Sequence, residues 1–309
     1  MRRNLLVVAA RVKPMAVLLS VLWGCGSGPE VRPEADPFGE RINQCIDAPR
    51  PRSDAAHTRM VAIAAGAAVL GSTEAERLQA RRDYGAGGER LFGDEAPARR
   101  SQVGAFRIDV SPVTNAQYAE FLAACGGLPP DHQALPAARW AQLRRSFDID
   151  YGYGFIQRFL WPGMEPTAER AKHPVVLVSH EDAGFYCAWR GGRLPTEEEW
   201  ERAARGPAGS YYPWGNRFDA FRANVAVSGP GDTTEVGKLP HGNTPEGVTD
   251  MGGHVHEWTS TPWPGRPGFV VVKGNGWDGR GGYGRGAARL ARTAKMLNVT
   301  LGFRCAADR

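Results

Sequence analysis

The stretch GVTDMGGHVHEW, from Gly247 to Trp258, decides the fold of this chain. It is followed by VVKGNGW at Val271–Trp277 and by LGFRC at Leu301–Cys305. Glycine and tryptophan recur in these motifs, and the 309 residues include 39 glycines, well above the average of roughly 7%. Together with nine tryptophans, this composition predicts a loop-rich domain in which large aromatic side chains anchor the loops. Helix and strand content should be modest.

Three further motifs precede this stretch, and the whole set keeps one order along the chain. They are HPVVLVSHEDAGFYCAW (His173–Trp189), RLPTEEEWERAARG (Arg193–Gly206) and YPWGN (Tyr212–Asn216). The ordered set resembles the formylglycine-generating enzyme, or sulfatase-modifying factor, family, with its ergothioneine-synthase and pyoverdine-maturation oxidase branches. The resemblance implies an α+β, C-type-lectin-like fold that is loop-rich with few helices, and a surface groove for an extended peptide.

The resemblance also locates the copper site of the catalytically active members. In those enzymes two cysteines, with four residues between them, follow a Gly-Gly-Ser-aromatic segment and bind copper(I), which activates oxygen to oxidise a substrate cysteine. Here the matching positions are Gly279 and Gly284, and the serine is Gly276. Glycine offers only backbone atoms, which cannot replace the soft thiolates that hold copper(I). Copper is therefore not expected as a cofactor, and formylglycine synthesis by the known route is disfavoured.

Local patterns predict the first strand and the starts of three helices. The segment MVAIAAG from Met60 alternates apolar residues in strand fashion and should end in a turn at Gly71. Thr114, Ser179 and Thr196 each stand three residues before a side chain that can reach back, as in a capping box. Each of these three residues should therefore begin a helix.

The amino terminus has the charge pattern of a secretory leader. Four basic residues precede an apolar stretch from Met15 to Trp23, which is shorter than the roughly 20 residues of a membrane span. The segment LWGC, ending at Cys25, resembles a bacterial lipobox, whose cysteine is lipidated; an ordinary secretory signal cut nearby is the alternative. We expect a lipoprotein signal peptide at 1–24, a flexible tether at 25–58 and the domain at 59–309. The mature protein would be a membrane-anchored lipoprotein of the bacterial cell envelope, facing the periplasm or the exterior.

The net charge gives no indication of a nucleic-acid partner. The formal net charge of the chain is +5. The leader contributes +4 of this, because it has four basic residues and no acidic one, so the mature protein has a net charge of +1. Binding to nucleic acid needs Lys and Arg clustered on the folded surface. The local basic run that includes Arg285, Arg289 and Lys295 is interpreted as a solvated face, in which Arg292 matches a structural arginine of the family.

Cysteine usage indicates an oxidising compartment. With Cys25 assigned to lipid, four cysteines remain, and four allow three pairings. The resemblance implies that Cys187 is bridged to Cys305, because the matching family positions are bridged. Cys45 and Cys125 then either pair with each other or remain as two free buried thiols.

Calcium is a further cofactor implied by the resemblance, held by carbonyl and carboxylate oxygens that suit a hard ion. At one of the two sites His254 replaces the family's asparagine, and calcium does not favour an imidazole nitrogen. That second site is the weaker candidate. The candidate ligands are Asn224, Val225 and Asp232 at the first site, and Gly253, Val255 and Glu257 at the second.

Three histidines stand where the family has other residues, and they suggest a different metal site. His180 and His256 replace tryptophan, and His254 replaces asparagine. If His254 and His256 lie on one strand, their side chains share a face, and imidazole suits zinc, copper or iron. The alternative is that the three histidines fill aromatic or polar niches without a metal.

The resemblance leaves two main functions open. The missing thiolates favour a non-catalytic module that binds a peptide or small-molecule ligand in a groove around Trp277, Tyr283 and Arg292. A poorly matching insertion at 128–172 would shape that groove. A metal site at the histidines would instead favour a copper-independent oxidase of the same family. A binding protein diversified by a retroelement is a third candidate, because such proteins share this fold and a similar GFR segment.

Overall fold

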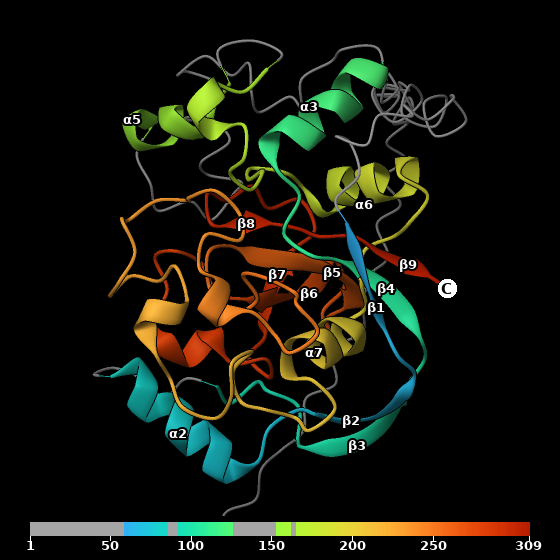
Figure 1. The fold of residues 1–309 in the computed structure, drawn as a ribbon, viewed down its shortest axis with the longest axis vertical. Coiled ribbons are helices and arrows are strands. Elements are labelled where there is room, and N and C mark those ends of the chain that lie inside the picture. Colours follow the sequence, from blue (N-terminus) through green and yellow to red (C-terminus); the bar gives the residue numbers. More distant parts are fainter. Residues whose placement is uncertain (1–58, 86–91, 126–152, 162–164) are drawn as a thin grey trace, which may run out of the picture. The chain divides into compact units, whose positions relative to one another are not determined.

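The computed structural model describes residues 59–85, 92–125, 153–161 and 165–309, and within them the strands form three small sheets (Figure 1). Neighbouring strands are antiparallel except for β5 and β8, which run parallel. The sheets consist of β1 (Met60–Ile63), β4 (Phe106–Asp109) and β9 (Ala306–Asp308); of β2 (Gly66–Leu70) and β3 (Arg99–Val103); and of β7 (Leu290–Thr293), β6 (Phe269–Gly274), β5 (His256–Pro262) and β8 (Leu301–Gly302).

Part of the predicted organisation lies outside the described residues. The leader and the tether, with Cys25 and Cys45, belong to this part, and so does most of the insertion expected at 128–172. Cys125 is described and is disulfide-bonded. The alternative of a free thiol at Cys125 is therefore wrong.

The strand predicted from Met60 is divided into two strands of different sheets. The first, β1, pairs with β4, and the second, β2, pairs with β3, so the chain changes sheets at Ala64 and Ala65. Gly71 directly follows β2, with φ +74°, and a Cβ atom there would lie 2.4 Å from the carbonyl oxygen of Pro97. Glycine satisfies both this backbone angle and this close approach.

The three predicted helix starts are confirmed. Thr114, Ser179 and Thr196 each accept a hydrogen bond from the backbone N–H three residues on, and the side chain at that position bonds back to the cap. α6 packs against β5, and α7 packs against β5 and β6 (Figure 1). No helix of the described residues is long and apolar enough to span a membrane. The helices are α2 (Glu74–Tyr84), α3 (Asn115–Ala124), α5 (Tyr153–Ile156), α6 (His180–Trp189) and α7 (Glu197–Arg205), with 3₁₀ turns η3 (Gln157–Phe159), η4 (Ala168–Arg170), η5 (Ala220–Arg222), η6 (Pro240–Gly242) and η7 (Gly281–Gly284).

The disulfide between Cys187 and Cys305 lies in the main hydrophobic core, and both cysteines are fully buried. It joins α6 to the residue that directly precedes β9. Aromatic rings surround it: the centroid of Tyr186 lies 5.6 Å from that of Tyr118 and 5.3 Å from that of Phe303. The pairing implied by the family resemblance is present in this α+β, loop-rich fold.

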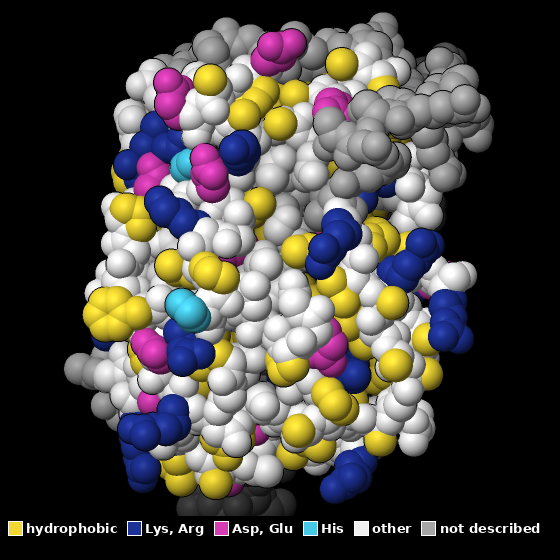
Figure 2. Space-filling view, viewed as in Figure 1, with side chains coloured by type: hydrophobic (Ala, Val, Ile, Leu, Met, Phe, Trp, Pro, Cys, Tyr) yellow, Lys and Arg dark blue, Asp and Glu magenta, His cyan; other side chains and the backbone are white. Residues whose placement is uncertain are grey.

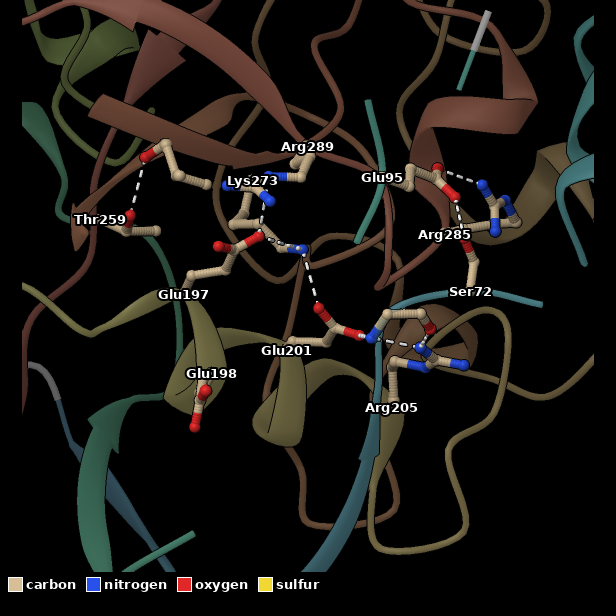
Figure 3. Close-up of polar contacts among 12 residues, drawn as sticks. Ser72, Glu95, Glu197, Glu198, Glu201, Arg205, Thr259, Lys273, Arg285 and Arg289 are labelled. Atoms are coloured by element: carbon tan, nitrogen blue, oxygen red, sulfur yellow. Dashed lines mark hydrogen bonds and ion pairs between the residues drawn. The ribbon is translucent and has the colours of Figure 1, made fainter. Parts of the chain in front are cut away.

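A row of eight alternating charges runs between α2, the loop before β3, α7, β6 and the segment after η7, and we call it the charge chain (Figure 3). Each interior member contacts an oppositely charged side chain on either side. From Arg285 to Arg289 the nitrogen–oxygen distances lie between 2.8 and 3.8 Å. The members, in order, are Glu95, Arg285, Glu76, Arg205, Glu201, Lys273, Glu197 and Arg289.

The four acids and four bases of the charge chain affect two of its buried carboxyl groups differently. At Glu76, burial outweighs the nearby Arg205 and Arg285 and raises the pKa. Burial alone would raise the pKa of Glu201, but Lys273 and Arg205 together hold that pKa below its usual value. The basic run with Arg285 and Arg289 was predicted to lie on a solvated face, and for these two residues the prediction is wrong. Arg285 is fully buried, and the side chain of Arg289 is only 9% exposed, because their acidic partners lie in the interior.

We predict that Lys273→Met lowers the free energy of unfolding by about 3 to 5 kcal/mol, because it removes one of the two basic partners of the buried Glu201 carboxylate and leaves only Arg205 beside it. Adding Glu201→Gln should recover part of this loss, since the stranded charge is then removed. Urea denaturation of the wild type, the two single variants and the double variant measures the coupling. Strictly additive effects would contradict a direct pairing of the two side chains.

Candidate functional site

The two positions that match the copper-binding cysteines follow β6, one in a turn and the other at the end of η7. A Cβ atom on Gly279 would lie 1.9 Å from Oδ1 of Asn275. A Cβ atom on Gly284 would lie 2.5 Å from the carbonyl oxygen of Gly252. Both distances are well inside van der Waals contact. The space that each cysteine would need is therefore occupied.

Asn275 is the residue of this site that sequence reasoning missed. It stands at the second glycine of the Gly-Gly-Ser-aromatic segment, so the signal was present in the motif. Its side chain is fully buried, and Nδ2 donates to the carbonyl oxygen of Arg280 over 3.0 Å. This bond holds Oδ1 against Gly279. The serine position, Gly276, is closed as well, because a Cβ atom there would lie 2.6 Å from Oδ1 of Asp278.

Trp277 does not line an open groove, contrary to the prediction. Only 4% of its surface is exposed, and Nε1 donates to the carbonyl oxygen of Val299 over 3.2 Å. The ring of Phe159 stacks on the indole, with 6.2 Å between centroids and 11° between planes, and the ring of Phe155 lies 5.9 Å away. The described end of the insertion therefore covers this part of the predicted groove.

Arg158 ties the covering segment, α5 and η3, to a distant loop. Its guanidinium lies 3.8 Å from the ring centroid of Phe155. Nη2 donates to the carbonyl oxygen of Gly231 over 3.2 Å, and Nη1 lies 3.6 Å from the carboxylate of Asp232. The segment is thus held over Trp277 by ring stacking and by charge.

The other two groove candidates make different contacts. The ring of Tyr283 packs edge-on against those of Tyr84 and Phe92, at centroid distances of 5.8 and 5.0 Å. Arg292 lies on β7 and is partly buried. Burial, together with the charge of Arg292, lowers the pKa of His256 to about 4, so this imidazole is neutral at pH 7.

The three histidines do not form a shared metal site. Nε2 of His180 donates to the carbonyl oxygen of Thr259, and Nδ1 of His256 donates to that of Gly274, each over 2.9 Å. His254 precedes β5, and its φ of +101° breaks the strand alternation expected to align it with His256. Within the described ranges no three His, Cys, Asp or Glu side chains are placed to hold a metal ion.

Comparison with known proteins identifies the family. Residues 47–309 match the family described as sulfatase-modifying factor enzyme 1-like domain. The chain belongs to this family. It is 37% identical over 252 residues to the mouse (Mus musculus) protein named inactive C-alpha-formylglycine-generating enzyme 2, covering 69% of this chain and 79% of that one. It is 35% identical over 209 residues to the formylglycine-generating enzyme of Mycobacterium tuberculosis, covering 57% and 70%.

Two solved structures share the fold of this sulfatase-modifying factor domain. PvdO from Pseudomonas aeruginosa has a TM-score of 0.62 at 22% identity, and the match covers 85% of this chain and 100% of that one. Treponema denticola variable protein 1 has a TM-score of 0.55 at 18% identity, covering 81% and 95%. At these identities the likeness concerns the fold alone, and the predicted family fold is confirmed.

The second calcium candidate of the sulfatase-modifying factor family does not fit this chain. The carboxylate of Glu257 accepts hydrogen bonds from Arg304 over 2.7 and 2.8 Å and from Nε1 of Trp200 over 2.7 Å. These groups are all buried. Both carboxylate oxygens of Glu257 are thus engaged by a guanidinium. Gly253 and Val255 offer only backbone carbonyls, so this site has no free carboxylate of the kind that calcium prefers.

The first calcium candidate keeps part of its donor set. Oδ1 of Asn224 is buried and has no hydrogen-bond partner in the described part of the chain, whereas the carbonyl oxygen of Val225 already accepts from the backbone N–H groups of Ser228 and Gly229 over 3.1 and 2.7 Å. However, both carboxylate oxygens of Asp232 accept from Arg170, over 2.9 and 2.7 Å. Calcium would have to share Asp232 with this guanidinium. Calcium at Asn224 and Val225 stays a prediction.

We predict that the double variant Gly279→Cys with Gly284→Cys does not gain tight copper(I) binding, because neither cysteine fits its position. Overpacking should instead lower stability by about 1 to 3 kcal/mol at each site. Gly104→Cys is the matched control, since a Cβ atom there meets nothing within 4 Å. Competition with a copper(I) chelator and thermal unfolding are the measurements. Stoichiometric copper(I) binding at unchanged stability would refute the packing argument.

Proposed function

We propose that this chain is a non-catalytic, ligand-binding member of the sulfatase-modifying factor family. One observation carries the proposal: the side-chain positions of both copper ligands are closed, by Asn275 at Gly279 and by the carbonyl of Gly252 at Gly284. The absence of thiolates removes the ligands of copper(I). The absence of space means that a cysteine side chain would not fit at either position. Loops on a rigid scaffold remain, and such loops commonly carry recognition.

The names of the relatives support this proposal. The proteins from mouse and cattle (Bos taurus) are both named inactive C-alpha-formylglycine-generating enzyme 2, and the cattle protein is 33% identical over 261 residues. The alternative, a copper-independent oxidase acting on a peptide or small molecule, needs another metal site. No side-chain group suited to one is found in the described residues. Support for the binding function comes from the closed copper positions.

We predict that the reduced, copper-loaded domain does not convert a sulfatase-type cysteine peptide into its formylglycine form, because no thiolate pair holds the metal near the substrate. Mass spectrometry of the peptide detects the aldehyde. The Mycobacterium tuberculosis formylglycine-generating enzyme serves as positive control and copper without protein as negative control. Turnover above the copper-only sample would overturn the proposed function.

We further propose that Cys25 anchors the domain to the membrane of a bacterial cell envelope. The basic leader, the short apolar stretch and the segment LWGC support this proposal. Cys25→Ser should move the protein from the membrane fraction to the soluble fraction, since the lipid attaches at the thiol. Ser27→Ala is the neighbouring control and should leave the protein in the membrane. Equal fractionation of both variants would rule out the anchor.

A further inference from the structure

A polar hollow of about 570 Å³ lies between α2 and the loop from Tyr211 to Phe218. Tyr212 ties this loop to the helix: its hydroxyl donates to Oδ2 of Asp83 over 2.5 Å, and its ring stacks on Trp214. The hollow is therefore formed by two connected elements. The polar side chains that line it are Gln79, Arg82, Asp83, Tyr211, Asn216 and Arg217.

Hydrogen bonds inside the wall leave the hollow rich in donors. Oδ1 of Asp83 accepts from Nε2 of Gln79 over 2.8 Å, and its Oδ2 accepts from Tyr212, so both carboxylate oxygens are already engaged. Oδ1 of Asn216 accepts from the backbone N–H of Tyr211 over 2.9 Å. This bond fixes the orientation of the Asn216 amide and leaves its NH₂ group to donate to a ligand.

Arg82 and Arg217 give the hollow a positive charge. Neither guanidinium forms an ion pair with any part of the chain that the structure describes. Figure 2 shows Lys and Arg side chains gathered at the lower left, where Figure 1 places α2. Guanidinium groups bind carboxylate and phosphate oxygens through paired N–H donors. An anionic ligand group is therefore favoured here.

The rings of Tyr211 and Phe218 add aromatic surface to the same hollow. Phe218 packs on Tyr212 at 5.6 Å between centroids, whereas the partly buried ring of Tyr211 packs on no other aromatic ring of the described residues. An aromatic face can pack against the C–H face of a sugar while nearby donors bind its oxygens. The lining thus combines a surface for a sugar ring with donors for hydroxyl and acidic groups.

We propose that this hollow binds an acidic carbohydrate, a sugar that carries a carboxylate or a phosphate ester. The sugar ring packs on Tyr211, the acidic group lies between Arg82 and Arg217, and a hydroxyl accepts from Asn216. The inference rests on the proposed ligand-binding function and gives that function a ligand class. The site shares no residue with the closed copper positions.

Calorimetric titration with D-glucuronic acid, glucose 6-phosphate, glucose and inorganic phosphate tests this site. At least one of the acidic sugars should bind about tenfold or more tightly than glucose and phosphate, a gain of about 1.4 kcal/mol. Tighter binding of D-glucuronic acid would indicate a site for a carboxylate, and tighter binding of glucose 6-phosphate a site for a phosphate ester. Arg82→Ala with Arg217→Ala should weaken acidic-sugar binding about tenfold or more. Tyr211→Ala should weaken it while leaving phosphate binding unchanged.

Arg100→Ala is the matched control, because Arg100 is an exposed arginine on β3, outside the hollow. It should bind like the wild type. Glucose binding as tightly as the acidic sugars, or unchanged binding in the double arginine variant, would overturn the proposal. So would phosphate binding as tightly as both acidic sugars. Formylglycine turnover would overturn the proposed function without altering these titrations, so the two failures can be told apart.

Discussion

The charge chain from Glu95 to Arg289 constrains the rest of this fold. A charge removed from water is stable only beside an opposite one, and each interior member here has opposite charges on both sides. Its members come from α2, α7, β6, the loop before β3 and the segment after η7. Their pairing therefore fixes the relative positions of elements that share no strand ladder. Apolar packing alone is non-directional and would specify those positions less sharply.

This constraint also bears on the positions that match the copper ligands, which are closed rather than empty. The loop that carries Gly279 and Gly284 is held on both sides, by Lys273 before it and by Arg285 after it. Neighbouring groups, above all the amide of Asn275, fill the space that side chains would have taken. Protein interiors are close-packed, so a site of this kind resists the return of larger residues. Packing thus argues against copper independently of ligand chemistry.

The features that could be read from the sequence are those set by nearby residues or by motif order. The capping boxes, the α+β fold and the disulfide belong to this group. Ion pairs between distant residues could not be read. In the sequence Arg285 looks like a surface residue, because its buried partner Glu76 is 209 positions away. Asp232 and Glu257 resemble metal ligands for the same reason, since the guanidinium groups that engage them lie 62 and 47 positions away.

The disulfide also has a topological consequence. The bond closes a covalent ring across a separation of 118 residues. The part of the chain within this ring includes α7, the loop from Tyr211 to Phe218, the two positions Gly279 and Gly284, and β8. One backbone cut inside the ring, for example beside Phe221, whose surface is 84% exposed, releases no fragment while the bond is intact. In denaturing electrophoresis, the nicked protein would therefore separate into two pieces only after the disulfide is reduced.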